Sequence, residues 1–437
     1  MSSSNGMEDD MTAEQITALG PAFSLFTQSF ASCFPRSDTR RHLTTYGRGL
    51  LSDLPRKSVE PIALAGGTAV RTLQEFLTHH VWDHERMRDQ LQRRIVRDHL
   101  PAPGAARPGA SGLGVIGLID ETGTAKKGDK TPGVQRQWCG RLGKVENCLV
   151  TVHLACLYGD FKSLIDSDLF LPEKTWDADR DRCRGAHVPD SVVYRPKSVI
   201  ALEQYRRAVA NGLHFDWLTF DEWYGSKPQF LAELERLGQN YVAEVPSNTL
   251  CWPTLPKYNS KQKPFAAKRV DNIGRHSPVF TRLAWRKVKI KRKTLPPQRW
   301  LVKAAQVHLS RSGAPTDRTY WLIVAENQET GEIKYFLSNA PPRTALQTLL
   351  DVAFTRANVE HVFRVAKSEI GFSHFEGRSY IGLMRHMILC QGVLTFVAEQ
   401  TDRLRGEKPG NHPRTSRPGA QYGLSLKPAL RLQALAG

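Results

Sequence analysis

The sequence is poor in three features, and each shortage excludes a class of protein. Its seven cysteines form no CxxC pair, which argues against a zinc site and favours free thiols in a reducing compartment. No stretch approaches the roughly 18 apolar residues that a membrane helix needs. The N-terminus, MSSSNGMEDDMTAEQ, is polar and acidic, unlike a secretory signal. We therefore expect a cytoplasmic protein with no membrane partner.

Acidic residues are scarce where basic residues are concentrated. The 437-residue chain holds 61 Lys and Arg against 43 Asp and Glu, a net charge of +18. Residues 251–303 contain fifteen Lys and Arg but one acid, Asp271. A surface evolved for solubility would mix both signs, so this segment predicts phosphate contacts with a polyanion. Its interleaved Trp and Val residues argue against a disordered basic loop.

Residues 21–105, near the N-terminus, are predicted to be helical. Within it, RKSVEPIALAGGTAVRTLQEFL has the plan of a helix, a Gly66–Gly67 turn and a second helix, as in helix-turn-helix DNA-binding domains. A helical lid or dimerisation element would give the same pattern, and the basic residues around it favour DNA. A Pro/Gly/Ala-rich linker at 101–112 predicts a domain boundary.

The stretch GLGVIGLIDETGTAKKG then predicts a buried strand that ends in Asp120 and Glu121. A buried carboxylate is costly unless a cation compensates it, and a divalent metal ion with oxygen ligands would do so. The simpler alternative is a strand followed by a polar turn. HFDWLTFDEWYG repeats the pattern, with a short apolar strand that ends in Asp221 and Glu222.

The order of the predicted elements from residue 112 is three strands, helix, strand, helix, strand, which is typical of an RNase H-like α/β sheet. Ligands of open α/β sheets bind beyond the carboxyl ends of the strands, so Asp120 and Asp221 are expected to meet there. An all-β insertion should follow, and helices then resume. The predicted segments are 1–20 (flexible), 21–105 (helical, DNA-binding), 112–248 (first part of the core), 249–342 (basic β insertion), 343–400 (C-terminal core helices) and 401–437 (basic disordered tail).

The predicted helix ANVEHVFRVAKSEIG places Glu360 among Arg356, Arg364 and Lys367, at spacings that share one helix face. An ordinary row of ion pairs would look the same, but this helix is the first strong one after the insertion, where the core must resume.

Asp120 in LIDETGTAKKG, Asp221 in TFDEWYG, and Arg356, Glu360 and Lys367 with three and six residues between them resemble bacterial insertion-sequence DDE transposases. The resemblance is to the group whose RNase H-like core is interrupted by a β insertion. That group has a tyrosine three residues before the arginine, where this chain has Ala353.

The resemblance implies that Asp120, Asp221 and Glu360 bind two Mg²⁺ or Mn²⁺ ions, since two-metal sites stabilise both oxygens of a phosphoryl displacement. Glu121 and Glu222 should face away, because successive residues of a strand point to opposite faces. The residues expected to contact DNA are Arg356, Lys367, Arg364, Lys126, Lys127, Lys287, Lys289, Lys291, Arg292 and Lys293. For the loop lysines, a solvated turn is an equal alternative.

The implied function is a DNA transposase that binds terminal inverted repeats, cleaves the element's ends and joins the 3′-hydroxyls to target DNA. Its partner would be double-stranded DNA, and two ends imply a homodimer in the synaptic complex. Two alternatives share the fold: a domesticated regulator that binds DNA without cleavage, and a nuclease without strand transfer.

Overall fold

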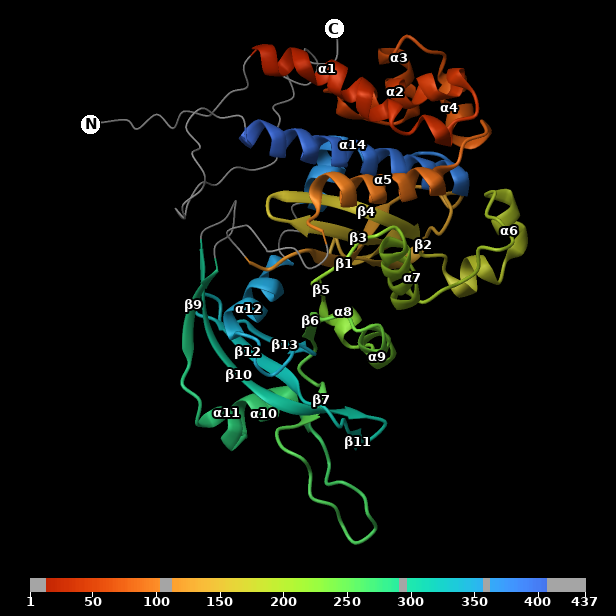
Figure 1. The fold of residues 1–437 in the computed structure, drawn as a ribbon. Helices are drawn as coiled ribbons and strands as arrows, with labels where there is room; N and C mark the ends of the chain where they lie inside the picture. Colours follow the sequence, from red (N-terminus) through yellow and green to blue (C-terminus); the bar gives the residue numbers. More distant parts are fainter. Residues whose placement is uncertain (1–12, 103–111, 291–296, 357–361, 407–437) are drawn as a thin grey trace.

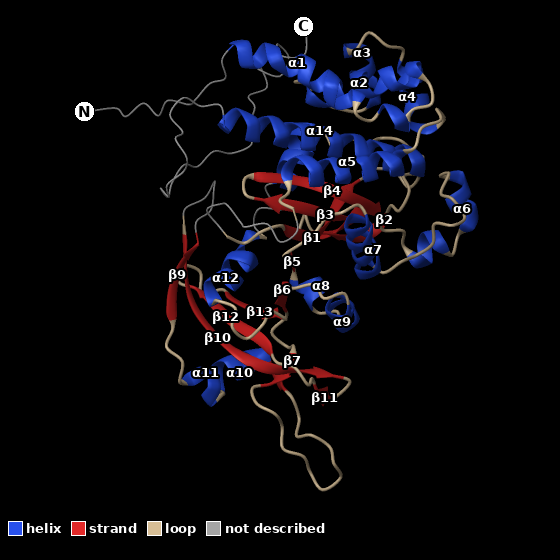
Figure 2. Ribbon diagram, viewed as in Figure 1, coloured by secondary structure: helices blue, strands red, loops and turns tan. Residues whose placement is uncertain are grey.

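The computed structural model describes residues 13–102, 112–290, 297–356 and 362–406 (Figure 1). Helices gather at one end of the molecule and strands run through its middle to the other end (Figure 2). The strand that contains Asp120 and the strand that ends just before Asp221 lie in the middle of the molecule, between the two parts.

Five strands form the centre in the order β4–β3–β1–β5–β6. β1 (Ile116–Ala125) pairs antiparallel with β3 (Lys144–Tyr158), which pairs antiparallel with β4 (Phe161–Leu169). On its other side β1 pairs parallel with β5 (Trp217–Phe220), and β5 pairs parallel with β6 (Tyr241–Val245). All residues of β5 are buried, as expected for a parallel strand covered on both faces. The predicted mixed α/β sheet is present, and its predicted strands and helices follow one another in the expected order, with additional elements between them.

Several shorter elements surround this centre. α7 packs its buried residues, including Ile200 and Tyr205, against β3 and β4. The sequence did not predict β2, η2 or α6, which lie in polar or mixed segments without a clear period. The elements are β2 (Gln135–Cys139), η2 (Glu173–Asp177), α6 (Arg180–Gly185), α7 (Lys197–Ala210), α8 (Glu222–Gly225), α9 (Pro228–Arg236) and α12 (Leu346–Thr355).

The insertion continues the central sheet. Its last strand, β13, pairs antiparallel with β6, with Ser338 opposite Val242, so the core and the insertion share one 13-stranded sheet. The insertion also contains two helices, which corrects the prediction of an all-β segment. Its elements are β7 (Leu250–Trp252), β8 (Lys268–Arg269), α10 (Val270–His276), α11 (Pro278–Thr281), β9 (Arg286–Ile290), β10 (Gln298–Arg311), β11 (Ala314–Pro315), β12 (Tyr320–Asn327) and β13 (Ile333–Ser338).

The N-terminal helices form a layer above the sheet (Figure 1). The first begins at Ala13, inside the segment predicted to be flexible. The predicted turn between two helices is present, and Gly67 adopts φ +60°, a left-handed conformation that glycine allows without strain. The helices are α1 (Ala13–Gln28), η1 (Ala31–Cys33), α2 (Ser37–Leu51), α3 (Val59–Ala65), α4 (Val70–Thr78) and α5 (His84–His99).

The long helix α14 (Tyr380–Gly406) lies between this layer and β4. It is long and apolar enough to cross a membrane, but 94% of its most apolar window is buried inside the protein, as in a core helix. Tyr46 of α2 and His386 of α14 share a buried hydrogen bond of 2.9 Å. Because α14 extends to Gly406, its last residues occupy the start of the predicted tail; residues 407–437 lie outside the described residues.

Candidate active site

The sheet brings Asp120 and Asp221 together. β1 and β5 run parallel with Ile119 opposite Phe220, so the next residue of each strand is one of the two aspartates. β5 ends there, and Asp221 caps α8: its Oδ1 accepts hydrogen bonds from the backbone N–H groups of Trp223 and Tyr224, at 3.0 and 3.2 Å. This cap fixes the direction in which the Asp221 carboxylate can point.

Asp120 is in an environment that opposes its negative charge. Its side chain is only 14% exposed. Burial raises the pKa of Asp120 to about 7; the Arg356 guanidinium acts in the opposite direction, while the negative charge of Asp221 adds to the rise. A second carboxylate beside a buried one is costly unless a cation neutralises both. The negative charges of the Asp120 and Asp221 carboxylates are not fully balanced by the cations around them. Their oxygen atoms therefore suit a hard divalent cation.

Within the described ranges, no three His, Cys, Asp or Glu side chains are grouped to hold a metal ion. The predicted third acid, Glu360, lies outside the described residues, so the structure places only two of the three predicted ligands.

The neighbouring acids face other partners. Glu121 forms an ion pair with Lys197, whose Nζ lies 2.6 Å from Oε2, and Glu222 is exposed. The Lys197 ammonium also lies 4.4 Å from the centre of the Trp223 ring. Tyr224 is fully buried, and burial, with the charges of the nearby carboxylates, raises the pKa of its hydroxyl well above 10. The Tyr224 phenol therefore stays neutral beside the aspartates.

Arg356 connects Asp120 to a residue that the sequence analysis missed. Its Nη2 lies 3.9 Å from Asp120 Oδ2, and its Nη1 lies 3.4 Å from Oε2 of Glu244, on β6. The other oxygen of Glu244 accepts a 2.8 Å hydrogen bond from Lys334 of β13. The sequence signal that could have identified Glu244 is a carboxylate inside the apolar run YVAEV, the strand that follows the one ending at Asp221.

The predicted helix with Arg356, Glu360, Arg364 and Lys367 on one face is described only at its two ends. Arg356 is the C-cap of α12, and Lys367 lies in a π-helical turn, η3 (Ala366–Ile370); residues 357–361, which include Glu360, lie outside the described residues. Lys367 is half-buried; burial lowers its pKa, and Asp120 is among the charges that act on it. Arg364 is exposed.

The predicted loop lysines differ in their surroundings. Lys126 is half-buried and donates a hydrogen bond from Nζ to the Phe375 carbonyl. Burial, and then the positive charge of Arg56, lower the pKa of Lys126 to about 8. Lys127 is exposed in the following turn. Lys126 thus holds the loop against the segment before α14, whereas Lys127 is available to a ligand.

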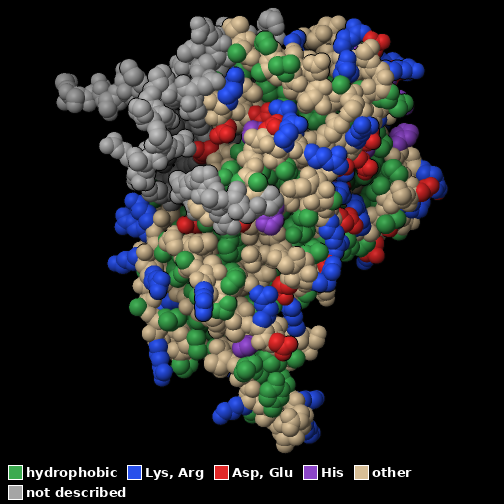
Figure 3. Space-filling model, viewed as in Figure 1, with side chains coloured by type: hydrophobic (Ala, Val, Ile, Leu, Met, Phe, Trp, Pro, Cys, Tyr) green, Lys and Arg blue, Asp and Glu red, His purple; other side chains and the backbone are tan. Residues whose placement is uncertain are grey.

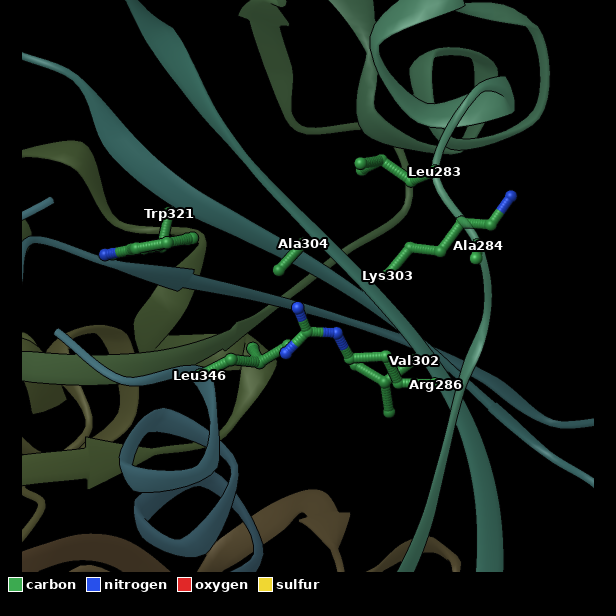
Figure 4. A pocket seen from close by; sticks show the side chains of 8 residues that line it. All are labelled: Leu283, Ala284, Arg286, Val302, Lys303, Ala304, Trp321 and Leu346. Atoms are coloured by element: carbon green, nitrogen blue, oxygen red, sulfur yellow. The ribbon is translucent and has the colours of Figure 1, made fainter. Parts of the chain in front are cut away.

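The structure describes only part of the basic segment, residues 251–303. Lys287 and Lys289 are exposed on β9, and Lys291, Arg292 and Lys293 lie outside the described residues. Blue side chains are visible on this part of the molecule in Figure 3. A cavity of about 270 Å³ lies nearby, between β10, β12 and the start of α12 (Figure 4); its lining includes Arg286, Lys303, Trp321 and Leu346.

Comparison with known proteins identifies the family. The family model described as DDE superfamily endonuclease matches residues 29–301, more than half of the chain. The chain belongs to the DDE superfamily endonuclease family. The matched region of this DDE endonuclease contains Asp120 and Asp221 and ends before Arg356.

A curated relative agrees with this assignment. The DDE endonuclease is 28% identical over 357 residues to the "Probable transposase for insertion sequence element IS701" of Microchaete diplosiphon, covering 81% of each chain. The family and this relative support a transposase role. Among solved structures, a piggyBac transposase synaptic complex with hairpin DNA matches 92% of this chain and 75% of its own, at 11% identity and a TM-score of 0.42.

Proposed function

We propose that this DDE endonuclease is a DNA transposase with an RNase H-like core, and that it cleaves the ends of its element and joins their 3′-hydroxyls to target DNA. The observation that carries the proposal is the pairing of Asp120 with Asp221 at adjacent ends of parallel strands, beside the guanidinium of Arg356. The sheet order β4–β3–β1–β5–β6 supports the fold assignment.

Asp120, Asp221 and Glu360 would hold two Mg²⁺ or Mn²⁺ ions. When bound, such ions activate a water or a 3′-hydroxyl and stabilise the leaving oxygen of a phosphodiester. The two aspartates fit this role because both are acidic oxygen donors, and the Arg356 guanidinium, 3.9 Å from Asp120 Oδ2, does not offset the rise in the Asp120 pKa that burial causes. The buried Tyr224 would exclude water from the back of the site.

The cations around the aspartates would bind the substrate. Arg356 and Lys367 would hold DNA phosphates, with Arg364, Lys126, Lys127 and the basic residues of the insertion along the duplex: Lys287, Lys289, Lys291, Arg292 and Lys293. The N-terminal helices would bind the terminal inverted repeats. Since two ends must be brought together, the active complex would be a homodimer.

The decisive experiment compares Asp221→Ala with Glu222→Ala on a plasmid that carries the element's ends. Asp221→Ala should bind the ends but lose Mg²⁺-dependent cleavage, whereas Glu222→Ala, which removes the exposed neighbour, should cleave normally. Undiminished cleavage by Asp221→Ala would contradict the site assignment.

The products separate transposase from the two alternatives. Cleaved 3′ ends joined to new DNA are expected of a transposase, cleavage without joining would indicate a nuclease, and end binding without nicking in Mn²⁺ would indicate a regulator.

A further inference from the structure

The hairpin formed by β2 and β3 exposes a large apolar pair. Trp138 on β2 is 60% exposed and is the cross-strand partner of Val145 on β3, which is 50% exposed. Cross-strand partners lie on the same face of a sheet. Among the described residues, none stacks on the Trp138 ring or accepts a hydrogen bond from its Nε1. The pair therefore offers an aromatic ring and an adjacent apolar side chain to a ligand.

The opposite face of β2 holds the hairpin in place. Cys139 is buried, and Gln137 donates a 2.9 Å hydrogen bond from Nε2 to the Cys148 carbonyl. Because side chains alternate between the faces of a strand, this anchoring directs Trp138 and Arg136 outward. We call Arg136, Trp138, Val145 and Asn147 the outer hairpin face.

The charge around this face is positive. Residues 135–145 include Arg136, Arg141 and Lys144 and no acid. Lys144 lies 3.2 Å from Glu146 in an ion pair, but Arg136 and Arg141 are exposed.

Asn147 joins the outer hairpin face to the lysine loop. It lies opposite Arg136, and its Nδ2 donates hydrogen bonds to the carbonyls of Lys126 and Gly128, at 2.7 and 2.9 Å. The exposed Lys127 follows directly in this loop. The apolar pair therefore continues into a surface that carries positive charge.

The hairpin is built on the strand next to that of Asp120. β3 is the direct neighbour of β1, and Val145 precedes His153, the residue opposite Asp120, by eight positions along β3. At the hairpin's turn, the positive charge of Arg141 acts on Lys367, on which the charge of Asp120 also acts. A DNA strand that extends from the aspartates along β3 would reach the hairpin.

We propose that the outer hairpin face is a DNA-contact surface, on which Trp138 stacks against a terminal or unpaired base while Arg136 binds a neighbouring phosphate. An aromatic ring among cations suits single-stranded nucleic acid, because every base offers a face for stacking and the phosphates match the charge. A protein partner is less well matched, since the apolar pair has three basic residues around it, Arg136, Arg141 and Lys144, against one acid, Glu146. The inference rests on the proposed function for the presence of DNA at the site.

The test uses fluorescence anisotropy with two labelled DNA probes: a duplex of the element's end with a short single-stranded 3′ overhang, and the same duplex with blunt, capped ends. Trp138→Ala should weaken binding of the overhang probe roughly 10-fold, the effect of removing one stacked base. Trp138→Phe should restore most of the affinity, which also shows that the hairpin remains folded. The capped probe should change little.

Salt dependence separates stacking from charge. Trp138→Ala should leave the slope of log K against log salt unchanged, whereas Arg136→Ala should reduce it by about 1, the loss of one phosphate contact. Val209→Ala is the control: Val209 is also an exposed apolar residue, at 44%, but it lies on α7, outside the segments proposed to bind DNA.

Three results would overturn the inference. Equal binding of the overhang probe by Trp138→Ala and wild type would exclude stacking, and an equal loss in Val209→Ala would show that the effect is not local. Loss of a dimer in sedimentation, with DNA affinity unchanged, would assign the face to a second copy of the chain. If wild type bound and cleaved neither probe, the proposed function itself would fail, so the two failures are distinguishable.

Discussion

Gly225 packs so closely against Glu244 that a Cβ at position 225 would lie 1.9 Å from the Glu244 carbonyl oxygen. Gly225 ends α8, the helix that Asp221 begins, and Glu244 lies on the neighbouring strand β6. The orientation of Asp221 therefore depends on how close two backbones can approach. Only glycine permits this approach.

Gly225→Ala should push α8 away from β6 and displace the Asp221 carboxylate. Overpacking of a core costs about 1–3 kcal/mol, and a collision with backbone should fall at the upper end of that range. We expect a lower melting temperature and cleavage reduced by at least about 10-fold, since small misplacements of catalytic groups are costly. Thermal unfolding and a plasmid cleavage assay measure both. Gly185→Ala, whose added Cβ meets no atom within 4 Å, should match wild type in each.

Glu244→Gln should impair catalysis through Arg356. The substitution keeps the side chain's shape but removes its negative charge. That charge attracts the Arg356 guanidinium, which lies 3.4 Å from Glu244, and so holds it next to Asp120. We expect a cleavage rate about 10-fold lower with DNA affinity largely retained, and partial rescue by Glu244→Asp. Lys334→Met is the control, because it removes the other partner of Glu244 and leaves Arg356 in place. Equal losses in both variants would indicate a purely structural role for Glu244.

Asp120→Asn should abolish DNA cleavage and stabilise the metal-free protein against unfolding. Burial and Asp221 disfavour the charged carboxylate, so an amide of the same shape should raise the metal-free unfolding free energy at pH 8, by up to about 4 kcal/mol. Cleavage should be lost, and the increase in melting temperature that Mg²⁺ gives the wild-type protein should disappear. Differential scanning calorimetry with and without Mg²⁺ measures this. A destabilised variant that still responds to Mg²⁺ would remove Asp120 from the metal site.

Glu399 should make stability depend on pH. Burial would raise its pKa, but the neighbouring His99 and Arg94 outweigh burial and hold the pKa of Glu399 below its ordinary value of 4.5. Arg94 donates hydrogen bonds of 2.8 and 3.0 Å to it, between α5 and α14. A lowered pKa stabilises the fold above about pH 4.5, and that contribution is lost as the pH falls through the folded pKa.

Glu399→Gln should therefore destabilise the protein at pH 7 by about 3 kcal/mol, as expected when one partner of a buried ion pair is removed. The difference from wild type should shrink below about pH 4. Urea unfolding across this range provides the measurement, and Glu75→Gln, in an exposed pair with Arg71, should change little at any pH. A difference that stays constant with pH would exclude the ion pair as its cause.

The sequence predicted those parts of the site that depend on local patterns. Asp120 and Asp221 each follow an apolar run, and parallel pairing of two such strands is enough to bring their ends together. The Glu244–Arg356 contact could not be predicted in this way, because it joins residues 112 positions apart through pairing that no local pattern specifies.

The strand pairing of the insertion could likewise not be predicted from local sequence patterns. Its alternating runs predicted strands correctly, but the pairing of β13 with β6 depends on which strand edges remain open after the core has formed. The helices α10 and α11 are only seven and four residues long, too short for a helical period to be visible.

The position of α14 has a consequence for how the protein is made. This helix follows the whole catalytic core in the chain, yet α2, α4, α5 and β4 all pack on it. The N-terminal helices and the sheet therefore lack their common packing partner until α14 has been synthesised. We expect the nascent chain to hold its two aspartates firmly only after α14 has been added, so nuclease activity would begin no earlier than that.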